Sequence, residues 1–160
     1  MRVPIVMSQT KKEVGIDMKN KRFDQSLHDQ YDDAGREVVK DYFSSKLNIT
    51  AKDNPNTYGV DLLLYRENKL IGYAEVEVRN NWKTDTFPYD TLNVPYRKKK
   101  LLNNDLPTFF FSVNSIKTRM FCCKAENVLE CEVKENPNKY VKSDEYFYKV
   151  PVNILKTIEI

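Results

Sequence analysis

The most informative part of this sequence is GVDLLLYRENKLIGYAEVEVR, residues 59–79. Residues 60–65 are a short apolar run bounded by turn-forming residues, a pattern that predicts a largely buried strand. Residues 66–69 form a compact polar connection, after which residues 70–79 predict a second strand. We therefore expect an antiparallel β-hairpin at the centre of the molecule.

Three carboxylates lie on this predicted hairpin. Side chains alternate along a strand, so Glu75 and Glu77 point to one face, and the small apolar residues beside them point to the other. The hairpin also brings Asp61 opposite these two residues. Like charges at close range destabilise a sheet unless a cation, a shared proton or a basic neighbour compensates them. Carboxylate oxygens with open positions for water suit Mg²⁺, with Mn²⁺ as a possible substitute, so we predict a metal site formed by Asp61, Glu75 and Glu77.

A helix is predicted on the N-terminal side of the hairpin, from about residue 25 to residue 46. Apolar residues recur there at steps of three and four and form one stripe: Leu27, Tyr31, Ala34, Val38 and Tyr42. Glu37 lies on the flank of this stripe, so its carboxylate can reach the edge of the core. Residues 3–7 indicate a short strand before the helix, and residues 51–59 have the composition of turns throughout.

The C-terminal half predicts a second helix and further strands. Pro88 and Pro95 make residues 80–96 irregular, and Pro95 is well placed to open a helix over residues 97–102. Three more strands are expected, at residues 108–114, 118–123 and 146–152, and the first two of them are expected to pair. These elements indicate an α/β fold with a central mixed β-sheet flanked by helices, in a single domain that spans residues 1–160.

The order of these acidic residues resembles that of the PD-(D/E)XK nuclease superfamily. Glu37 matches the acid of the first helix, Asp61 the motif aspartate, Glu75 the (D/E) position and Glu77 the final position of the motif. The resemblance covers about residues 25 to 123, which loosely follow the family's order of helix, three strands, helix and strand.

The resemblance implies a restriction-endonuclease-like core and a Mg²⁺-dependent endonuclease that hydrolyses phosphodiester bonds of DNA. A metal-activated water would attack in line and leave a 5′-phosphate, with Asp61, Glu75, Glu77 and Glu37 as catalytic residues. Two positions depart from the motif, because Val60 replaces its proline and Glu77 replaces its lysine. Glu77 would then act as a base or as an additional metal ligand. Arg79 or Lys98 is a candidate to supply the missing positive charge.

Basic and aromatic residues after the hairpin are candidates for contacts with nucleic acid. Arg97 and Lys98 fall at the predicted start of a helix, where backbone N–H groups also favour phosphate, and Arg79 ends the acidic strand. Trp82 follows in the long loop, from which its ring could stack on a base. The simpler interpretation is that the basic residues 97–100 form a solvated helix face and that Trp82 is a buried anchor of the loop.

Composition excludes several other classes of function. The formal net charge is only +3, and His28 is the single histidine, which argues against Ser-His-Asp and Cys-His catalysis. The three cysteines lack the second Cys/His pair of a zinc site, and a structural role is expected for them. No apolar run approaches the ~20 residues that span a bilayer, and no signal-peptide pattern opens the chain. We expect a cytoplasmic protein without membrane contact, and a composition rich in Asn, Lys, Tyr and Ile fits a phage-encoded one.

For the endonuclease a homodimer is expected, because one such site cuts one strand. Two alternative functions remain open beside it. The first is a catalytically inactive nucleic-acid-binding or assembly module of the same fold, which the missing motif lysine favours. The second is an interaction protein without nucleic acid, in which the carboxylates are surface charges. Metal-dependent cleavage separates the endonuclease from both, and salt-dependent binding of phosphate separates the two alternatives.

Overall fold

The computed structural model describes residues 25–136 and 145–160, and it describes side chains in 33–135 and 145–160. The strand predicted at residues 3–7 lies outside these ranges. In chain order the elements are α1 (Gln25–Leu47), β1 (Thr50–Asp53), β2 (Leu62–Arg66), β3 (Lys69–Arg79), β4 (Thr91–Pro95), the 3-10 helix η1 (Tyr96–Lys98), α2 (Lys99–Leu102), β5 (Thr108–Asn114), β6 (Arg119–Lys124), α3 (Ala125–Leu129), β7 (Val133–Asn136), β8 (Glu145–Pro151), the 3-10 helix η2 (Val152–Ile154) and β9 (Lys156–Glu159).

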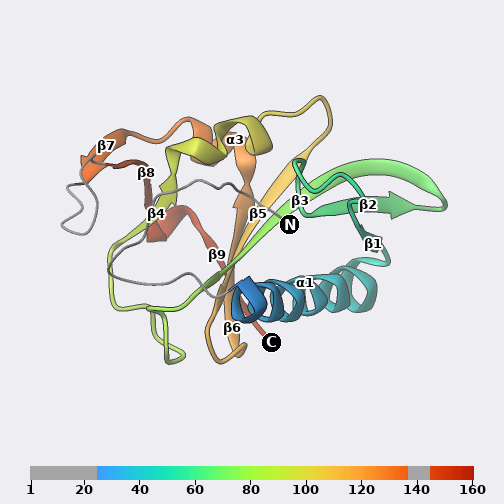
Figure 1. Ribbon diagram of the computed structural model, residues 1–160, viewed down its shortest axis with the longest axis horizontal. Helices are drawn as coiled ribbons and strands as arrows, with labels where there is room; N and C mark the ends of the chain where they lie inside the picture. The colour runs from blue at the N-terminus through green and yellow to red at the C-terminus, as the bar shows by residue number, and fades with distance from the viewer. Residues whose placement is uncertain (1–24, 137–144) are drawn as a thin grey trace.

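Six strands form a central sheet in the order β1-β2-β3-β5-β6-β9. The first three are an antiparallel meander, β3 and β5 run parallel, and β5, β6 and β9 are again antiparallel. A parallel pair needs a crossover connection, and the chain between β3 and β5 supplies it with β4, η1 and α2. A second sheet has three antiparallel strands in the order β4-β8-β7. The protein is therefore α/β with a mixed central sheet (Figure 1).

Apolar clusters cover the two faces of the central sheet. On one face α1 packs against β1 and β3, and its Val39 and Phe43 are buried together with Ala74 and Val76 of β3. On the other face Phe110 of β5 is buried with residues of β4, α2, α3 and β8: Leu92, Val94, Leu102, Val128, Tyr148 and Val150. Since neighbouring side chains of a strand point to opposite faces, the two glutamates of β3 point away from α1 and toward α2 and the second sheet.

Several predicted elements are confirmed. The helix over residues 25–46 is α1, and the hairpin is the antiparallel pair of β2 and β3, in which Leu62 lies opposite Ala74. The strands predicted at residues 108–114 and 118–123 are β5 and β6, and they pair as expected. Within the residues that the structure describes, no helix is long and apolar enough to cross a membrane.

Other predictions about local structure are wrong or incomplete. Residues 51–53 belong to strand β1, which pairs with β2, so the turn predicted at residues 51–59 is confined to its later part. The loop predicted at residues 80–96 contains β4, whose pairing with β8 stabilises it despite the flanking prolines. The predicted helix after Pro95 opens as 3-10 and continues as one short α-turn. The strand predicted at residues 146–152 is β8, but it lies in the second sheet.

Candidate functional site

Asp61 stands at the entrance to β2, where a structured loop holds it. The Asn54 side chain accepts a hydrogen bond from the amide of Asn56 and donates one to the carbonyl of Val60. The amide of Asn54 also donates to the carbonyl of Asp61 over 3.0 Å. Asp61 Oδ2 in turn accepts a hydrogen bond of 2.8 Å from the backbone N–H of Val76 in β3. The Asp61 carboxylate is thereby tied to the strand that carries the two glutamates.

Glu75 is a buried carboxylate that is paired with a lysine from the crossover connection. Lys98 Nζ, at the end of η1, donates to Glu75 Oε2 over 2.8 Å, and the two side chains are 17% and 5% exposed. Within the described part of the chain, the other oxygen, Oε1, is buried and accepts no hydrogen bond. A buried carboxylate oxygen without a donor is costly, so this atom is a position at which a cation would be stabilising.

The pKa of Lys98 reflects the proximity of three carboxylates, those of Asp61, Glu75 and Glu77. Burial of the ammonium acts to lower the pKa of Lys98, but the negative charges of Glu75, Glu77 and Asp61 outweigh burial and raise it above the usual lysine value. Lys98 is therefore a firmly protonated ammonium at neutral pH. The structure thus brings together Asp61, Glu75, Glu77 and Lys98, and we call these four residues the carboxylate cluster.

Glu77 is held in a fixed orientation by two neighbours. Its Oε2 accepts a hydrogen bond of 2.7 Å from Ser112 Oγ on β5 and one of 2.9 Å from Arg79 Nε, and it forms a close ion pair with Arg79 Nη2. Ser112 is fully buried, and it lies directly opposite Glu77 in the parallel pair of β3 and β5. The bonds from Ser112 and Arg79 orient this carboxylate within the sheet and offset its charge.

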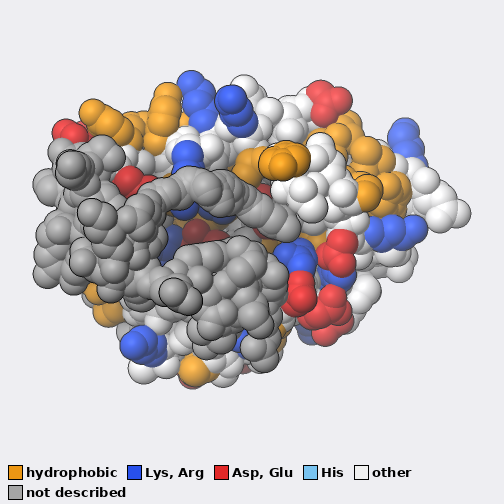
Figure 2. Space-filling model, in the orientation of Figure 1, with side chains coloured by type: hydrophobic (Ala, Val, Ile, Leu, Met, Phe, Trp, Pro, Cys, Tyr) orange, Lys and Arg blue, Asp and Glu red, His pale blue; other side chains and the backbone are white. Residues whose placement is uncertain are grey.

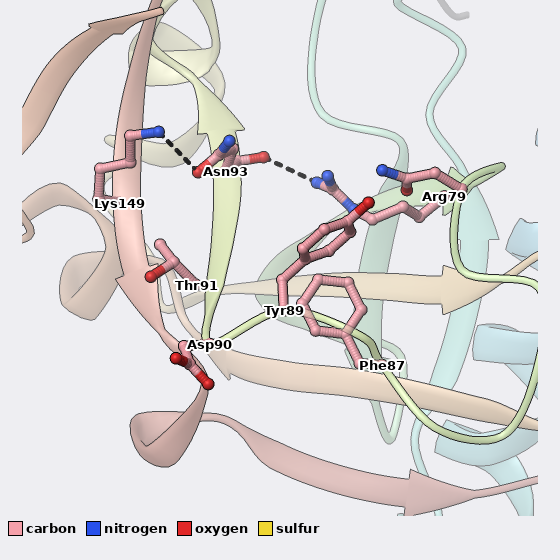
Figure 3. Close-up of a pocket in the computed structure, with 8 residues that line it drawn as sticks. Arg79, Phe87, Tyr89, Asp90, Thr91, Asn93 and Lys149 are labelled. Atoms are coloured by element: carbon pink, nitrogen blue, oxygen red, sulfur yellow. Dashed lines mark hydrogen bonds between the residues drawn. The ribbon is translucent and has the colours of Figure 1, made fainter.

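A chain of polar contacts leads from Glu77 to the second sheet. Arg79 Nη2 donates to the carbonyl of Asn93 on β4 over 2.8 Å, and the Asn93 side chain accepts a hydrogen bond of 3.1 Å from Lys149 Nζ on β8. Figure 3 shows these two contacts, with Arg79 and Lys149 on opposite sides of Asn93. Arg79 therefore joins the carboxylate cluster to a polar surface on the second sheet.

Glu37 does not join the carboxylate cluster. It is exposed on α1, which covers the face of the sheet opposite to that of Glu75, and it pairs with Lys40 over 2.9 Å. Lys40 also contacts Asp53 of β1 over 3.0 Å. Acidic and basic side chains lie next to one another on this side of the molecule (Figure 2). Glu37 therefore lies in a surface ion-pair network, apart from the carboxylate cluster, and its part in catalysis stays a prediction.

The three other predicted contacts with nucleic acid have different surroundings. Trp82 is 1% exposed and its ring stacks on Phe121 at a centroid distance of 4.5 Å, so Trp82 is the buried anchor of its loop and cannot stack on a base in this conformation. Arg97 is exposed and pairs with Glu145 over 2.9 Å. Arg79 belongs to the polar chain described above.

No preformed cage for a metal is present among the described side chains, since no group of three or more His, Cys, Asp or Glu residues there is arranged to hold an ion. Internal donors occupy at least one oxygen of Asp61, of Glu75 and of Glu77. The donor set nevertheless fits a hard cation: three carboxylates face two basic groups, and Glu75 Oε1 is buried without a donor.

Two members of the site, Ser112 and Asn93, were not among the residues predicted from the sequence. Ser112 interrupts the apolar run TFFFSV on β5, and a polar residue within a doubly buried strand is a usable signal of a contact with another polar group. Asn93 contributes through its backbone carbonyl as well as its side chain, and only the pairing of β4 with β8 places it there.

Comparisons with known proteins yield no match, whether with family models, with curated proteins or with solved structures.

Proposed function

We propose that this chain is a Mg²⁺-dependent endonuclease that hydrolyses phosphodiester bonds of DNA at the carboxylate cluster. The observation that carries the proposal is the buried glutamate Glu75, with one oxygen on Lys98 and the other without a donor, beside Asp61 and Glu77. A binding surface for nucleic acid has no use for carboxylates that repel phosphate. A metal-dependent hydrolase needs such carboxylates, because they hold the cation that attracts the phosphate.

The topology supports a restriction-endonuclease-like core. The chain runs from α1 through the antiparallel meander β1-β2-β3 to α2 and then to β5, which pairs with β3 in parallel. This is the family's order of helix, three strands, helix and strand, with β4 inserted before the second helix. Asp61 stands at the entrance to the second strand and Glu75 lies on the third, so the two acidic residues are on neighbouring strands, as the resemblance implies.

Lys98 is suited to replace the lysine that the motif lacks at Glu77. It reaches the cluster from η1, on the crossover connection, instead of from β3 itself. Its raised pKa keeps the ammonium protonated at neutral pH, so it can donate to a phosphate oxygen and offset the negative charge that develops in the transition state. For the same reason Lys98 is not a general base.

Each carboxylate has a distinct role in this proposal. Asp61 and Glu75 would hold the cation, and a bound Mg²⁺ would polarise the phosphoryl oxygen and acidify a water molecule. Glu77, oriented by Arg79 and Ser112, would hold a water molecule through its other oxygen and position it for attack. Arg79 would limit the repulsion between Glu77 and the incoming phosphate.

A cleavage assay tests the proposal. Labelled duplex, single-stranded and branched DNA are incubated with the wild type and with Glu75→Gln in the presence of Mg²⁺, Mn²⁺ or EDTA. Removal of a ligand carboxylate is expected to lower the cleavage rate by at least about 100-fold, and EDTA should abolish cleavage. Glu126→Gln, an exposed glutamate of α3, is the matched control and should cut as the wild type does.

Three outcomes of this assay decide between the functions. Metal-dependent cutting that Glu75→Gln loses and Glu126→Gln keeps supports the endonuclease. Equal cutting by all three proteins places the activity outside the cluster or in a contaminant, and contradicts the proposal. If the wild type cuts no substrate but binds DNA with a steep salt dependence, the catalytically inactive binding module is the better description.

A further inference from the structure

A polar pocket opens next to the carboxylate cluster, between the loop after β3 and strands β4 and β8. It has a volume of about 470 Å³, and its walls include Arg79, Phe87, Tyr89, Asn93 and Lys149. Pockets of roughly 300 to 1,000 Å³ hold small organic ligands. The pocket therefore has room for one nucleotide.

Arg79 belongs to both the pocket and the site. One side of its guanidinium binds Glu77 of the carboxylate cluster, and the same group donates to the carbonyl of Asn93 in the pocket wall. A ligand in the pocket and a phosphate at the cluster are thus separated by a single side chain. A strand whose phosphate lies at the cluster would place an adjoining nucleotide at the pocket.

Tyr89 gives the pocket an exposed aromatic wall. Its side chain is 55% exposed, and its ring meets that of Phe87 edge to face at 5.5 Å. Phe87 in turn packs edge to face on Trp82 at 5.4 Å and on Phe121 at 5.2 Å, within the core. Tyr89 is therefore an exposed ring on a rigid support, which is the usual arrangement of a stacking platform for a base.

The remaining walls carry groups that recognise a nucleotide. The side-chain oxygen of Asn93 and the ammonium of Lys149 lie 3.1 Å apart, and Figure 3 shows Asn93 and Thr91 on strand β4 and Tyr89 on the loop that leads into it. Cations bind phosphate, an aromatic ring stacks on a base, and amides and hydroxyls bond to base edges or to the sugar. These three chemistries occur together in the pocket.

We propose that this pocket binds one unpaired nucleotide of the DNA strand, adjacent to the phosphate held at the carboxylate cluster. The inference rests on the proposed nuclease function and names its substrate class as single-stranded, flapped or locally unpaired DNA. A base within a duplex shows only its edges, since both of its faces are stacked. The face of Tyr89 can therefore receive only a base that has left the helix.

Binding without cleavage tests the proposal separately from the nuclease function. Fluorescence anisotropy with EDTA present measures the affinity of a short labelled oligodeoxythymidylate and of a blunt duplex for the wild type and three variants. Tyr89→Ala should weaken binding of the single strand about 5- to 150-fold, whereas Tyr89→Phe, which keeps the ring, should remain within about twofold. Tyr146→Ala, a tyrosine of β8 with 53% exposure outside the pocket, is the matched control.

Salt dependence tests the contact with phosphate. Lys149→Gln should reduce the slope of log K against log salt concentration by about 0.7 for the single strand, the value for one lost phosphate contact. The proposal is overturned if Tyr89→Ala binds as the wild type does, if the wild type binds duplex as tightly as the single strand, or if it binds no DNA. If the protein binds single-stranded DNA through Tyr89 but cuts no DNA, the nuclease function alone is contradicted. If it cuts DNA and needs Glu75 to do so, but Tyr89→Ala binds as tightly as the wild type, the proposal for the pocket alone is contradicted.

Discussion

Replacement of Lys98 by methionine tests the buried pair of Lys98 and Glu75, because this substitution keeps an unbranched aliphatic side chain and removes the charge. In Lys98→Met the carboxylate of Glu75 stays buried, with 5% of its side chain exposed, and loses the donor at 2.8 Å. Removing one partner of a buried ion pair destabilises a protein by about 3–5 kcal/mol. Since Lys98 is itself 17% exposed, water can partly replace it, and we expect about 3 kcal/mol.

Thermal unfolding measures this loss. For a chain of 160 residues, 1 kcal/mol corresponds to a change in Tm of about 2–4 °C, so Lys98→Met should unfold about 6–12 °C below the wild type in EDTA. The control Lys100→Met, an exposed lysine of α2, should stay within about 0.5 kcal/mol. Added Mg²⁺ should raise the Tm of Lys98→Met more than that of the wild type, because the ion takes the place of the lost ammonium.

The pH dependence gives a second readout of the same pair. The raised pKa of Lys98 means that its contribution to stability is fully present below the ordinary lysine value and is lost as the pH rises through the folded pKa. The difference in stability between wild type and Lys98→Met should thus be constant near neutral pH and shrink in strong alkali. A Tm of Lys98→Met within about 1 °C of that of Lys100→Met would refute the buried pair.

Three other residues or pairs yield further predictions. A Cβ at Gly72 would lie 2.6 Å from the carbonyl oxygen of Pro107, so Gly72→Ala should lower the free energy of unfolding by about 1–3 kcal/mol in a denaturant titration. Trp82→Ala should cost about 3–5 kcal/mol in the same titration, and Trp82→Phe clearly less, because the buried indole N–H has no acceptor among the described residues; equal losses would contradict this. Burial raises the pKa of Cys122 and of Cys123 to about 12, so at mildly alkaline pH both remain neutral thiols; in a Cys131→Ser protein, which lacks the third free thiol, they should react with Ellman's reagent only after unfolding, and rapid reaction of that folded protein would show that they are accessible.

Local patterns in the sequence were sufficient to predict the elements whose stability is local. The hairpin of β2 and β3 has apolar strands with a short polar turn, and its partners lie next to each other in the chain. Strand β4 could not be found in the same way, although Leu92 and Val94 alternate as strand residues do. Its partner β8 lies more than fifty residues away, and only that pairing outweighs the prolines around it.

The site shows the same division between local and long-range information. Alternation along one strand places Glu75 and Glu77 on one face, and the hairpin adds Asp61, so these three were predictable together. The direction of the Glu37 side chain depends on which face of the sheet α1 covers, and that of Trp82 depends on where Phe121 lies. Both depend on tertiary packing, which local sequence patterns do not specify. Lys98 was one of two candidates for the missing charge, and only the path of the crossover connection selects it over Arg79 as the partner of Glu75.

An anomalous difference map from a crystal soaked in Mn²⁺ would show whether the carboxylate cluster binds a metal, because it locates the ion without reference to activity. We predict a peak bound by Asp61 and by Glu75 Oε1, the oxygen without a donor among the described residues, with Lys98 Nζ still on Glu75 Oε2. No peak there in a fully soaked crystal, or a peak only at a surface pair such as Glu37 and Asp53, would contradict the assignment of the carboxylate cluster as a metal-dependent nuclease site.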